Sequence, residues 1–300
     1  MKAVGVIDCH VHHYSADVRA DPEGWARAQG EHLWRTCVAP SDRASLQDWA
    51  DTDRLLRDMD AAGVERVVLQ SWYWETPAVC LRQNRFLAEC VAAHPDRLSA
   101  FAGLPFAEGE EAVLEEARWA LQDGGFLGFG ELHPGLHALE VNRTAWDTLA
   151  TFAAHRQVPL LLHVTEPVGR SYPGRVETPF APLLAFIAEH ARTTFTLAHL
   201  GGLLPLYALN PFVEKQLTNV YVDIAAVPLL YRPEACAIMA RLLGPDRLLF
   251  GSDYPLRTVP RAQTHADFQA PLDNLRAAGL DPDSLQRALG ANARQLLHLP

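Results

Sequence analysis

Three histidines stand close together near the N-terminus, in the stretch VIDCHVHH (6–13). Side chains alternate between the two faces of a strand, so His10 and His12 point the same way and His13 points the other way. Two neutral imidazoles on one face at a strand end can supply half of a metal site. The plain alternative is a polar loop, so the metal hypothesis requires further ligands from other parts of the chain.

Further ionisable side chains stand at the ends of later apolar runs. They are Glu131 with His133, then His163, His199 and Asp253. If these runs are the strands of one barrel, their ends meet with the histidine pair on a single rim. Imidazole and carboxylate ligands without thiolates suit Zn²⁺, Mn²⁺, Fe²⁺ or Co²⁺, and spacing does not choose among these ions.

The apolar runs also predict the fold. Helical patterns separate most of them, and they are short and rich in β-branched residues: 4–8, 64–71, 98–104, 126–132, 158–164, 194–200, 220–225 and 247–253. Continuous apolar runs are typical of parallel strands buried on both faces. We therefore expect an α/β protein, a (β/α)8 TIM barrel that forms a single domain over 1–300. A doubly wound open sheet is the alternative, but the Gly-rich turn after its first strand is missing.

Helices and loops are predicted from the same pattern. The stretch 46–63 reads as an amphipathic helix with Trp49, Leu55, Leu56 and Met59 on one face and Gly63 as its C-cap. The segments 13–46, 165–182 and 201–218 lack a strong pattern, and each follows a predicted strand. We expect them to be long βα loops at the C-terminal rim, where barrels carry their active sites.

Composition narrows the classes of partner. The chain has 26 Lys and Arg against 36 Asp and Glu, a formal charge of −10, which argues against nucleic acid or an anionic membrane as a partner. The five cysteines form no C-x-x-C pair, so we expect reduced thiols in the cytoplasm. The expected partner is a small-molecule substrate, and the sequence leaves a homo-oligomer open.

The ordered ligand set resembles that of the amidohydrolase superfamily. The segments that carry the resemblance are IDCHVH, PLLLHV, TLAHLGG and LLFGSDYP, and the nearer match is the amidohydrolase-related branch with the aminocarboxymuconate-semialdehyde decarboxylase-like enzymes. This resemblance implies a catalytic divalent metal held by His10, His12, His163 and Asp253. It also implies that His199 binds a second metal or works as an acid/base.

The number of ions depends on Glu131. In binuclear members of the superfamily a carboxylate or a carbamylated lysine after strand four bridges the ions, and Glu131 resembles the bridge of the TatD-like hydrolases. With this bridge, one ion takes His10, His12 and Asp253, and the other takes His163 and His199. The resemblance favours two ions. In the alternative, a single ion takes His163 as well, and Glu131 pairs with an arginine or caps a helix.

The superfamily's prevailing chemistry sets the expected reaction. We expect a hydrolase that uses metal-activated water on an amide, ester or lactone bond of a small molecule. Asp253 would carry the proton from that water to the leaving group, and a metal ion or His199 would stabilise the developing oxyanion. The alternative is a non-oxidative decarboxylase or hydratase of a small carboxylic acid, in which His199 acts on the reacting carbon.

Several rim residues are candidates for contact with the substrate. They are Trp72, Tyr73, His133, Glu166, Arg170, Tyr172 and Tyr254. The aromatic side chains after strand two could form a wall for the substrate, or simply pack a loop. A guanidinium matches a carboxylate in geometry, although a loop arginine in solvent is the plainer interpretation of Arg170.

Overall fold

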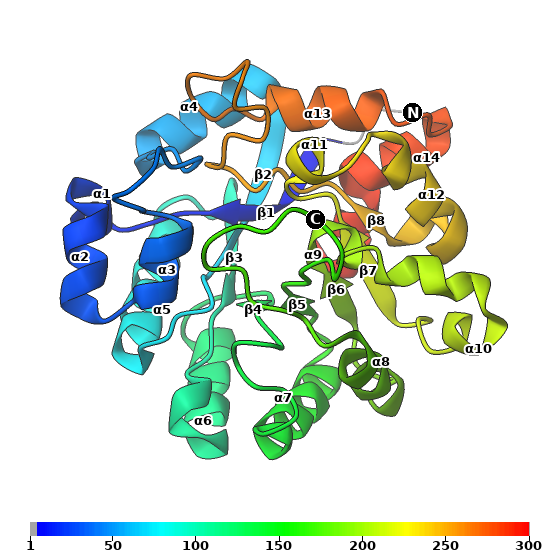
Figure 1. The fold of residues 1–300 in the computed structure, drawn as a ribbon, viewed down its shortest axis with the longest axis horizontal. Coiled ribbons are helices and arrows are strands. Elements are labelled where there is room, and N and C mark those ends of the chain that lie inside the picture. The colour runs from blue at the N-terminus through cyan, green and yellow to red at the C-terminus, as the bar shows by residue number, and fades with distance from the viewer. Residues whose placement is uncertain (1–4, 300) are drawn as a thin grey trace.

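The computed structural model describes residues 5–299. Its eight strands are parallel and neighbour one another in chain order, as Figure 1 shows. They are β1 (Val6–His12), β2 (Val64–Gln70), β3 (Leu98–Ala102), β4 (Gly128–Leu132), β5 (Leu160–Leu162), β6 (Phe195–Leu197), β7 (Val220–Asp223) and β8 (Leu248–Leu249). Helices lie outside the ring of strands, so the predicted (β/α)8 architecture is confirmed.

The ring is nearly closed by contacts between β1 and the segment that follows β8. The N–H of Cys9 donates to the carbonyl of Phe250 at 2.8 Å, and the N–H of His12 donates to that of Tyr254 at 2.7 Å. The N–H of Asp253 in turn donates to the carbonyl of His10 at 2.9 Å. The end of the chain's eighth strand is thereby fixed beside the first.

The outer layer explains why the strands read as continuous apolar runs. Every residue of β3, β4, β5 and β6 is buried, because side chains facing out are covered by helices. Beyond residue 46 the helices are α4 (Thr52–Ala62), α5 (Pro77–Ala93), α6 (Glu110–Gln122), α7 (Arg143–Arg156), α8 (Phe180–Glu189), α9 (Ala198–Gly201), α10 (Pro211–Glu214), α11 (Val227–Leu230), α12 (Glu234–Leu243), α13 (Gln269–Arg276), α14 (Pro282–Gln286) and α15 (Asn292–Leu296). Of these, α9 is a short turn that carries His199 at the barrel mouth and does not belong to the outer layer.

Strand boundaries differ from the prediction where the ligands lie. The predicted first run starts at Val4, which lies outside the described residues, and β1 continues to His12, so the histidine pair belongs to the strand itself. β5, β6 and β8 are shorter than predicted. His163, His199 and Asp253 therefore stand just beyond their strands, where the backbone is free to turn toward the barrel axis.

Two of the predicted loops contain helices. The segment 13–46 forms α1 (Ala16–Ala20), α2 (Pro22–Gln29) and α3 (His32–Cys37), and 201–218 forms the 3-10 helix η2 (Leu204–Leu209) and α10. These helices are short, so their stability comes mainly from tertiary packing, and the sequence shows no strong helical periodicity there. The third predicted loop, 165–182, has no helix or strand up to Pro179, and its last three residues belong to α8, which begins at Phe180.

The predicted helix over 46–63 is shorter than expected. α4 begins only at Thr52, because the Asp51 carboxylate accepts the N–H of Arg54 and caps the helix there. Trp49 consequently lies before the helix and packs near Tyr14 and Trp34, with ring centroids 5.8 and 6.0 Å away. The helix's C-cap at Gly63, in the left-handed region at φ 71°, agrees with the prediction.

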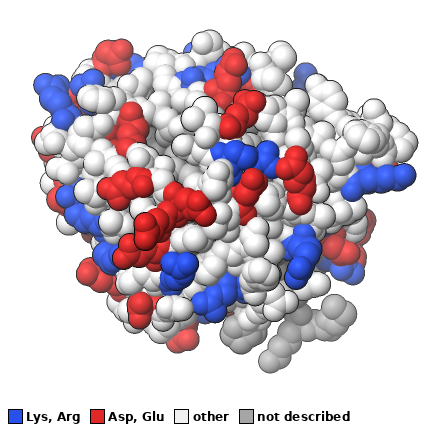
Figure 2. Space-filling view, turned by 90° about the horizontal axis from the view of Figure 1, so that it is seen from below, with Lys and Arg blue, Asp and Glu red and all other residues white. Residues whose placement is uncertain are grey.

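Charged side chains of both signs are mixed on the face shown in Figure 2, and the Lys and Arg residues coloured there form no continuous basic patch. Within residues 5–299, no helix combines the length and the apolar character that crossing a membrane requires.

Candidate active site

The ends of the strands bring the predicted ligands together in one cup at the barrel mouth. Two groups of side chains place their ligand atoms within 4.8 Å of one another: His10, His12 and Asp253 in one, and Glu131, His163 and His199 in the other. Residues from β1, β4 and the segments after β5, β6 and β8 therefore converge, although 243 positions separate the first and last of them. The predicted convergence is present in the structure, whereas binding of an ion to it stays a prediction.

The first group is built on the alternation of β1. His10 and His12 face the same side, and their Nε2 atoms lie 3.3 Å apart. The Asp253 Oδ1 atom lies 3.5 Å from the Nε2 of His12 and 4.0 Å from that of His10. His13 points away, as predicted, and its Nε2 lies 3.0 Å from the Thr52 hydroxyl.

Glu131 lies between the two groups. Its Oε2 atom is 3.7 Å from the Nε2 of His10 and 3.6 Å from that of His12. Its Oε1 atom is 2.8 Å from the Nδ1 of His163 and 3.5 Å from the Nε2 of His199. Each carboxylate oxygen therefore faces one pair of histidines, which is the arrangement that a bridging ligand requires.

Two residues of the cup adopt the left-handed backbone conformation. His199 has φ 58° and Asp253 has φ 64°, a region that side chains other than glycine rarely adopt and that occurs preferentially at functional sites. The N–H of His199 is held by the Asp223 carboxylate at 2.9 Å, and that of Asp253 by the carbonyl of His10. Surrounding hydrogen bonds therefore maintain both unusual conformations.

The sequence analysis missed Asp223, the last residue of β7. Its carboxylate is buried, and its Oδ2 atom lies 2.8 Å from the Nδ1 of His10. Burial opposes the charge of this carboxylate, but the positive charge and hydrogen bond of His10 outweigh that effect and lower the pKa of Asp223. The sequence did contain a signal for Asp223, because VYVD places an acidic residue near the end of a predicted strand. Glu131 and Asp253 are candidates for the same reason.

The carboxylates strongly affect the histidines that face them. Burial opposes a charge on His10, but Asp223 and Glu131 outweigh it and raise the pKa of His10 to about 10. Burial likewise opposes a charge on His199, and the hydrogen bond and charge of Glu131 raise its pKa to about 9. Burial and the charge on His10 lower the pKa of His12 to about 3. In the metal-free protein, protons on His10 and His199 thus balance the buried carboxylates at neutral pH.

Burial disfavours the charge on both acidic ligands, but their pKa values shift in opposite directions because the histidines outweigh burial only at Glu131. Burial raises the pKa of Asp253 to about 6, an effect that His10 and His199 reduce. Burial also opposes the charge on Glu131, but His163 and His10 hold its pKa well below the ordinary value. Asp253 is thus the carboxyl that can retain a proton near neutral pH, whereas Glu131 stays ionised.

The chemistry of this donor set fits a divalent cation. Nitrogen and oxygen lone pairs face one another at distances of 3.3 to 4.0 Å in the first group, and they are nearly inaccessible to water. Buried lone pairs with no donor between them are costly unless a cation or protons intervene. Imidazole with carboxylate suits Mn²⁺, Zn²⁺ or Fe²⁺.

Three predicted substrate contacts lie beside the cup. The ring of Tyr73 is 5.1 Å from that of His163 and 5.0 Å from that of His133, centroid to centroid. Trp72 stacks on Tyr73 at 4.0 Å and meets the ring of His12 edge-on at 5.7 Å. His133, Tyr73 and Trp72 therefore form an aromatic wall next to both ligand groups.

The other predicted contacts are not brought into this wall. Tyr254 is buried, its hydroxyl donates to Asp58 at 2.7 Å and its ring stacks on Phe268, so we withdraw it as a substrate contact. Arg170 and Tyr172 lie exposed on the segment 165–179. Glu166 is buried on the same segment, and its carbonyl accepts a hydrogen bond from Arg175.

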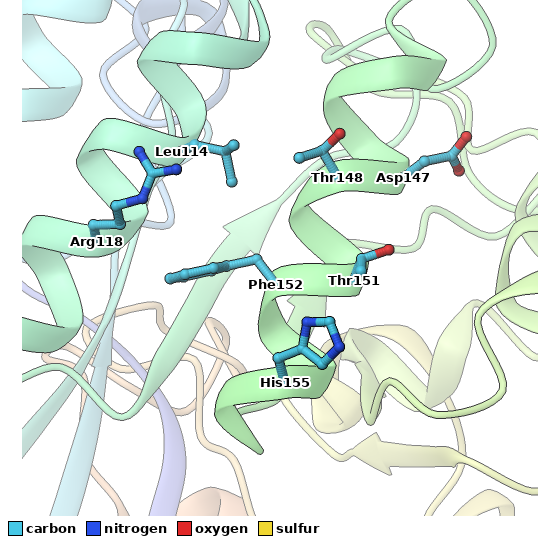
Figure 3. A pocket seen from close by; sticks show the side chains of 7 residues that line it. All are labelled: Leu114, Arg118, Asp147, Thr148, Thr151, Phe152 and His155. Carbon is cyan, nitrogen blue, oxygen red and sulfur yellow. The ribbon is translucent and has the colours of Figure 1, made fainter.

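An open groove of about 330 Å³ lies elsewhere, between α6 and α7 in the outer layer (Figure 3). Its lining consists of Leu114, Arg118, Asp147, Thr148, Thr151, Phe152 and His155. None of the residues of the cup lines this groove, so it does not bear on the chemistry of the ligand groups.

The order and geometry of the ligands agree with a family comparison. The model of the family described as Amidohydrolase matches residues 7–299. The chain belongs to the amidohydrolase family. This agrees with the predicted superfamily, while the likeness of Glu131 to the TatD-like bridge stays a prediction.

Among curated relatives of this amidohydrolase, the gamma-resorcylate decarboxylase of Rhizobium radiobacter is 25% identical over 264 residues, which cover 70% of this chain and 78% of the relative. A solved structure of 2,6-dihydroxybenzoate decarboxylase with 2,6-dihydroxybenzoate has a TM-score of 0.70 at 22% identity, covering 99% of this chain and 100% of that chain. The dihydroxybenzoic acid decarboxylase from Polaromonas sp. JS666, with bound manganese and the inhibitor 2-nitroresorcinol, has a TM-score of 0.70 at 19% identity, covering 99% and 97%. At these identities the solved structures establish a shared fold.

These relatives correct the expected reaction. Hydrolysis of an amide, ester or lactone bond was the expected activity, and that prediction is wrong, since the curated relatives and the two solved structures described above are decarboxylases. The ligand set alone could not reveal this, because the same cup serves hydrolysis and decarboxylation in the superfamily that the sequence resembles.

The pKa values predict how the stability of the metal-free protein depends on pH. The raised pKa values of His10 and His199 add stability that is fully present below their unfolded value of 6.5 and is lost as the pH rises through about 9 to 10. We expect the melting temperature of the metal-free protein, measured by calorimetry, to fall between pH 6.5 and 9. The fall should be shallower in His199→Gln, and an equal or steeper fall in that variant would contradict the assignment.

Proposed function

We propose that this protein is a metal-dependent, non-oxidative decarboxylase of a hydroxylated aromatic acid. The observation that carries the proposal is the match to gamma-resorcylate decarboxylase over most of both chains, combined with a cup that holds buried ligands beside an aromatic wall. An aromatic acid suits this wall, because rings pack favourably at centroid distances of about 4.5–7 Å.

The residues of the first group would hold the divalent ion, His10 and His12 through their Nε2 atoms and Asp253 through its carboxylate. A bound ion would supply the positive charge that holds the substrate's carboxylate or an adjacent oxygen. Manganese is present in one of the structural relatives, so Mn²⁺ is the first ion to test, with Zn²⁺ as the comparison. Glu131, His163 and His199 offer a second position, and we propose that Glu131 serves both.

The proposed reaction adds a proton to the ring carbon that bears the carboxylate. The bond between that carbon and the carboxylate then breaks, its electron pair returns to the ring, and the carboxylate leaves as CO₂. Asp253 is the proposed proton donor, because a carboxyl group that offers one oxygen to the ion keeps a second oxygen that can carry a proton. Asp253, whose side chain is 13% exposed, regains its proton from solvent before the next turnover.

The first test of the proposal is the product. We expect the Mn²⁺-loaded protein to convert 2,6-dihydroxybenzoate or a related hydroxybenzoate to the phenol with release of CO₂, measured by chromatography and by trapping of the gas. Protein stripped of metal by a chelator should be inactive, and activity should return with Mn²⁺. A product that has gained water would instead identify a hydratase. If the protein converts none of the hydroxybenzoates tested, this substrate class is rejected.

The role of Asp253 can be tested by Asp253→Asn. This variant keeps an oxygen ligand but cannot donate the proton, so we expect kcat to fall by about 10²–10⁴-fold, the usual range for general acid catalysis. Metal content should be measured in parallel by elemental analysis. The matched control is Asp42→Asn, since the Asp42 side chain is 79% exposed in the segment after α3. Near-normal kcat in a fully loaded Asp253→Asn protein would contradict the proposed role.

The number of ions can be counted directly. We expect metal-free protein to reach full activity with two equivalents of Mn²⁺, one for each ligand group. Glu131→Gln should lower the stoichiometry measured by calorimetric titration, because the amide replaces one of the two oxygens that face the histidine pairs. Saturation at one equivalent would reject the second ion and leave the first group, with His163, as the complete site.

A further inference from the structure

The turn after β7 makes hydrogen bonds to both ligand groups of the cup. The Oδ2 atom of Asp223 lies 2.8 Å from the Nδ1 of His10. Its Oδ1 atom accepts the N–H groups of His199 at 2.9 Å and of Ala225 at 3.0 Å. The carbonyl of Ala225 lies 3.0 Å from the Nδ1 of His199. Residues 223–225 therefore contact a histidine of each group through its Nδ1 atom.

These contacts fix which nitrogen of each ring carries the hydrogen. A carboxylate and a carbonyl oxygen can only accept, so the Nδ1 atoms of His10 and His199 must donate. In the neutral imidazole the Nε2 atom then holds a lone pair. For His10 this lone pair faces the carboxylates of Glu131 and Asp253, and for His199 it faces Glu131.

We propose that Asp223 is a positioning residue that sets the tautomers of His10 and His199 together, so that both present an Nε2 lone pair to a metal ion. It acts on His10 directly, and on His199 through the N–H of His199 and the turn that holds the Ala225 carbonyl. Carboxylates that accept from a metal-bound histidine are general orienting groups. This inference rests on the proposed metal dependence, but it is independent of the reaction that the metal supports.

The substitution Asp223→Asn keeps the size of the side chain but can reverse the direction of its hydrogen bond with the Nδ1 of His10. If the amide oxygen keeps the N–H groups of His199 and Ala225, the amide NH₂ faces the Nδ1 of His10 and donates to it. The neutral ring of His10 must then carry its hydrogen on Nε2, where it blocks the metal. If the amide turns over, its NH₂ group meets two backbone N–H groups, and the turn loses its acceptor.

The test measures metal affinity rather than turnover. Mn²⁺ dissociation constants should be determined for the wild type, Asp223→Asn and Asp223→Glu by competition with a chelator. We expect Asp223→Asn to bind Mn²⁺ about 10–100-fold more weakly, the usual cost of losing such an orienting group. Asp223→Glu keeps an acceptor and should recover part of this loss. Equal affinity of Asp223→Asn and the wild type would overturn the proposal.

A matched control separates positioning from general destabilisation. Glu116 is also a buried carboxylate, and it accepts hydrogen bonds from Asn84 and Arg85 in the helical layer, outside the cup. Glu116→Gln should lower the melting temperature without changing the Mn²⁺ dissociation constant. If it weakens Mn²⁺ binding as much as Asp223→Asn does, the effect is general and the proposal fails.

A second measurement uses the wild type and therefore does not depend on whether a variant folds. In zinc-loaded protein with ¹⁵N-labelled histidines, long-range NMR correlations show which ring nitrogen carries the hydrogen. We expect hydrogen on Nδ1 of His10 and His199, and hydrogen on Nε2 of either ring would overturn the proposal. The two proposals can fail separately. If Asp223→Asn binds metal more weakly but the wild type releases no CO₂ from any hydroxybenzoate, the tautomer assignment is supported and only the proposed reaction is rejected.

Discussion

The concentration of ionisable groups inside the barrel mouth is the constraint on which the site depends. Glu131 is buried as an anion, and four histidines face its two oxygens. An isolated buried charge is expensive, so such a group must be compensated by cations or by protons. The raised pKa values of His10 and His199 show how protons balance it in the metal-free protein. A divalent ion would replace these protons, so that metal binding and proton release are coupled.

The barrel satisfies this constraint through its backbone as much as through its side chains. Parallel strands deliver their C-terminal ends to one rim, and short strands leave His163, His199 and Asp253 in turns rather than in the sheet. The left-handed conformations of His199 and Asp253 are maintained by hydrogen bonds to Asp223 and His10. The geometry of these two ligands is thus fixed by hydrogen-bond partners on neighbouring strands.

The reaction depends on a different part of the structure from the ion. The ligand groups fit hydrolysis and decarboxylation equally well, because both reactions need a positive charge beside a carboxylate that can hold a proton. In the proposed decarboxylase, the surrounding wall makes the distinction by placing the ring carbon that bears the carboxylate beside the ligand groups. Trp72, Tyr73 and His133 form that wall, and their positions relative to the ligands emerge only when the barrel brings the C-terminal ends of β2, β4 and β5 to the same rim.

The sequence by itself predicted the barrel and the side chains that converge at its mouth. Alternation along a strand assigns His10 and His12 to one face, and continuous apolar runs predict buried parallel strands, because both properties are local. Tertiary structure alone decided the helices of 13–46, the orientation of Tyr254 toward Asp58 and the partnership of Asp223 with His10. These depend on contacts between residues as many as 213 positions apart, and no local pattern contains the distance between two such side chains.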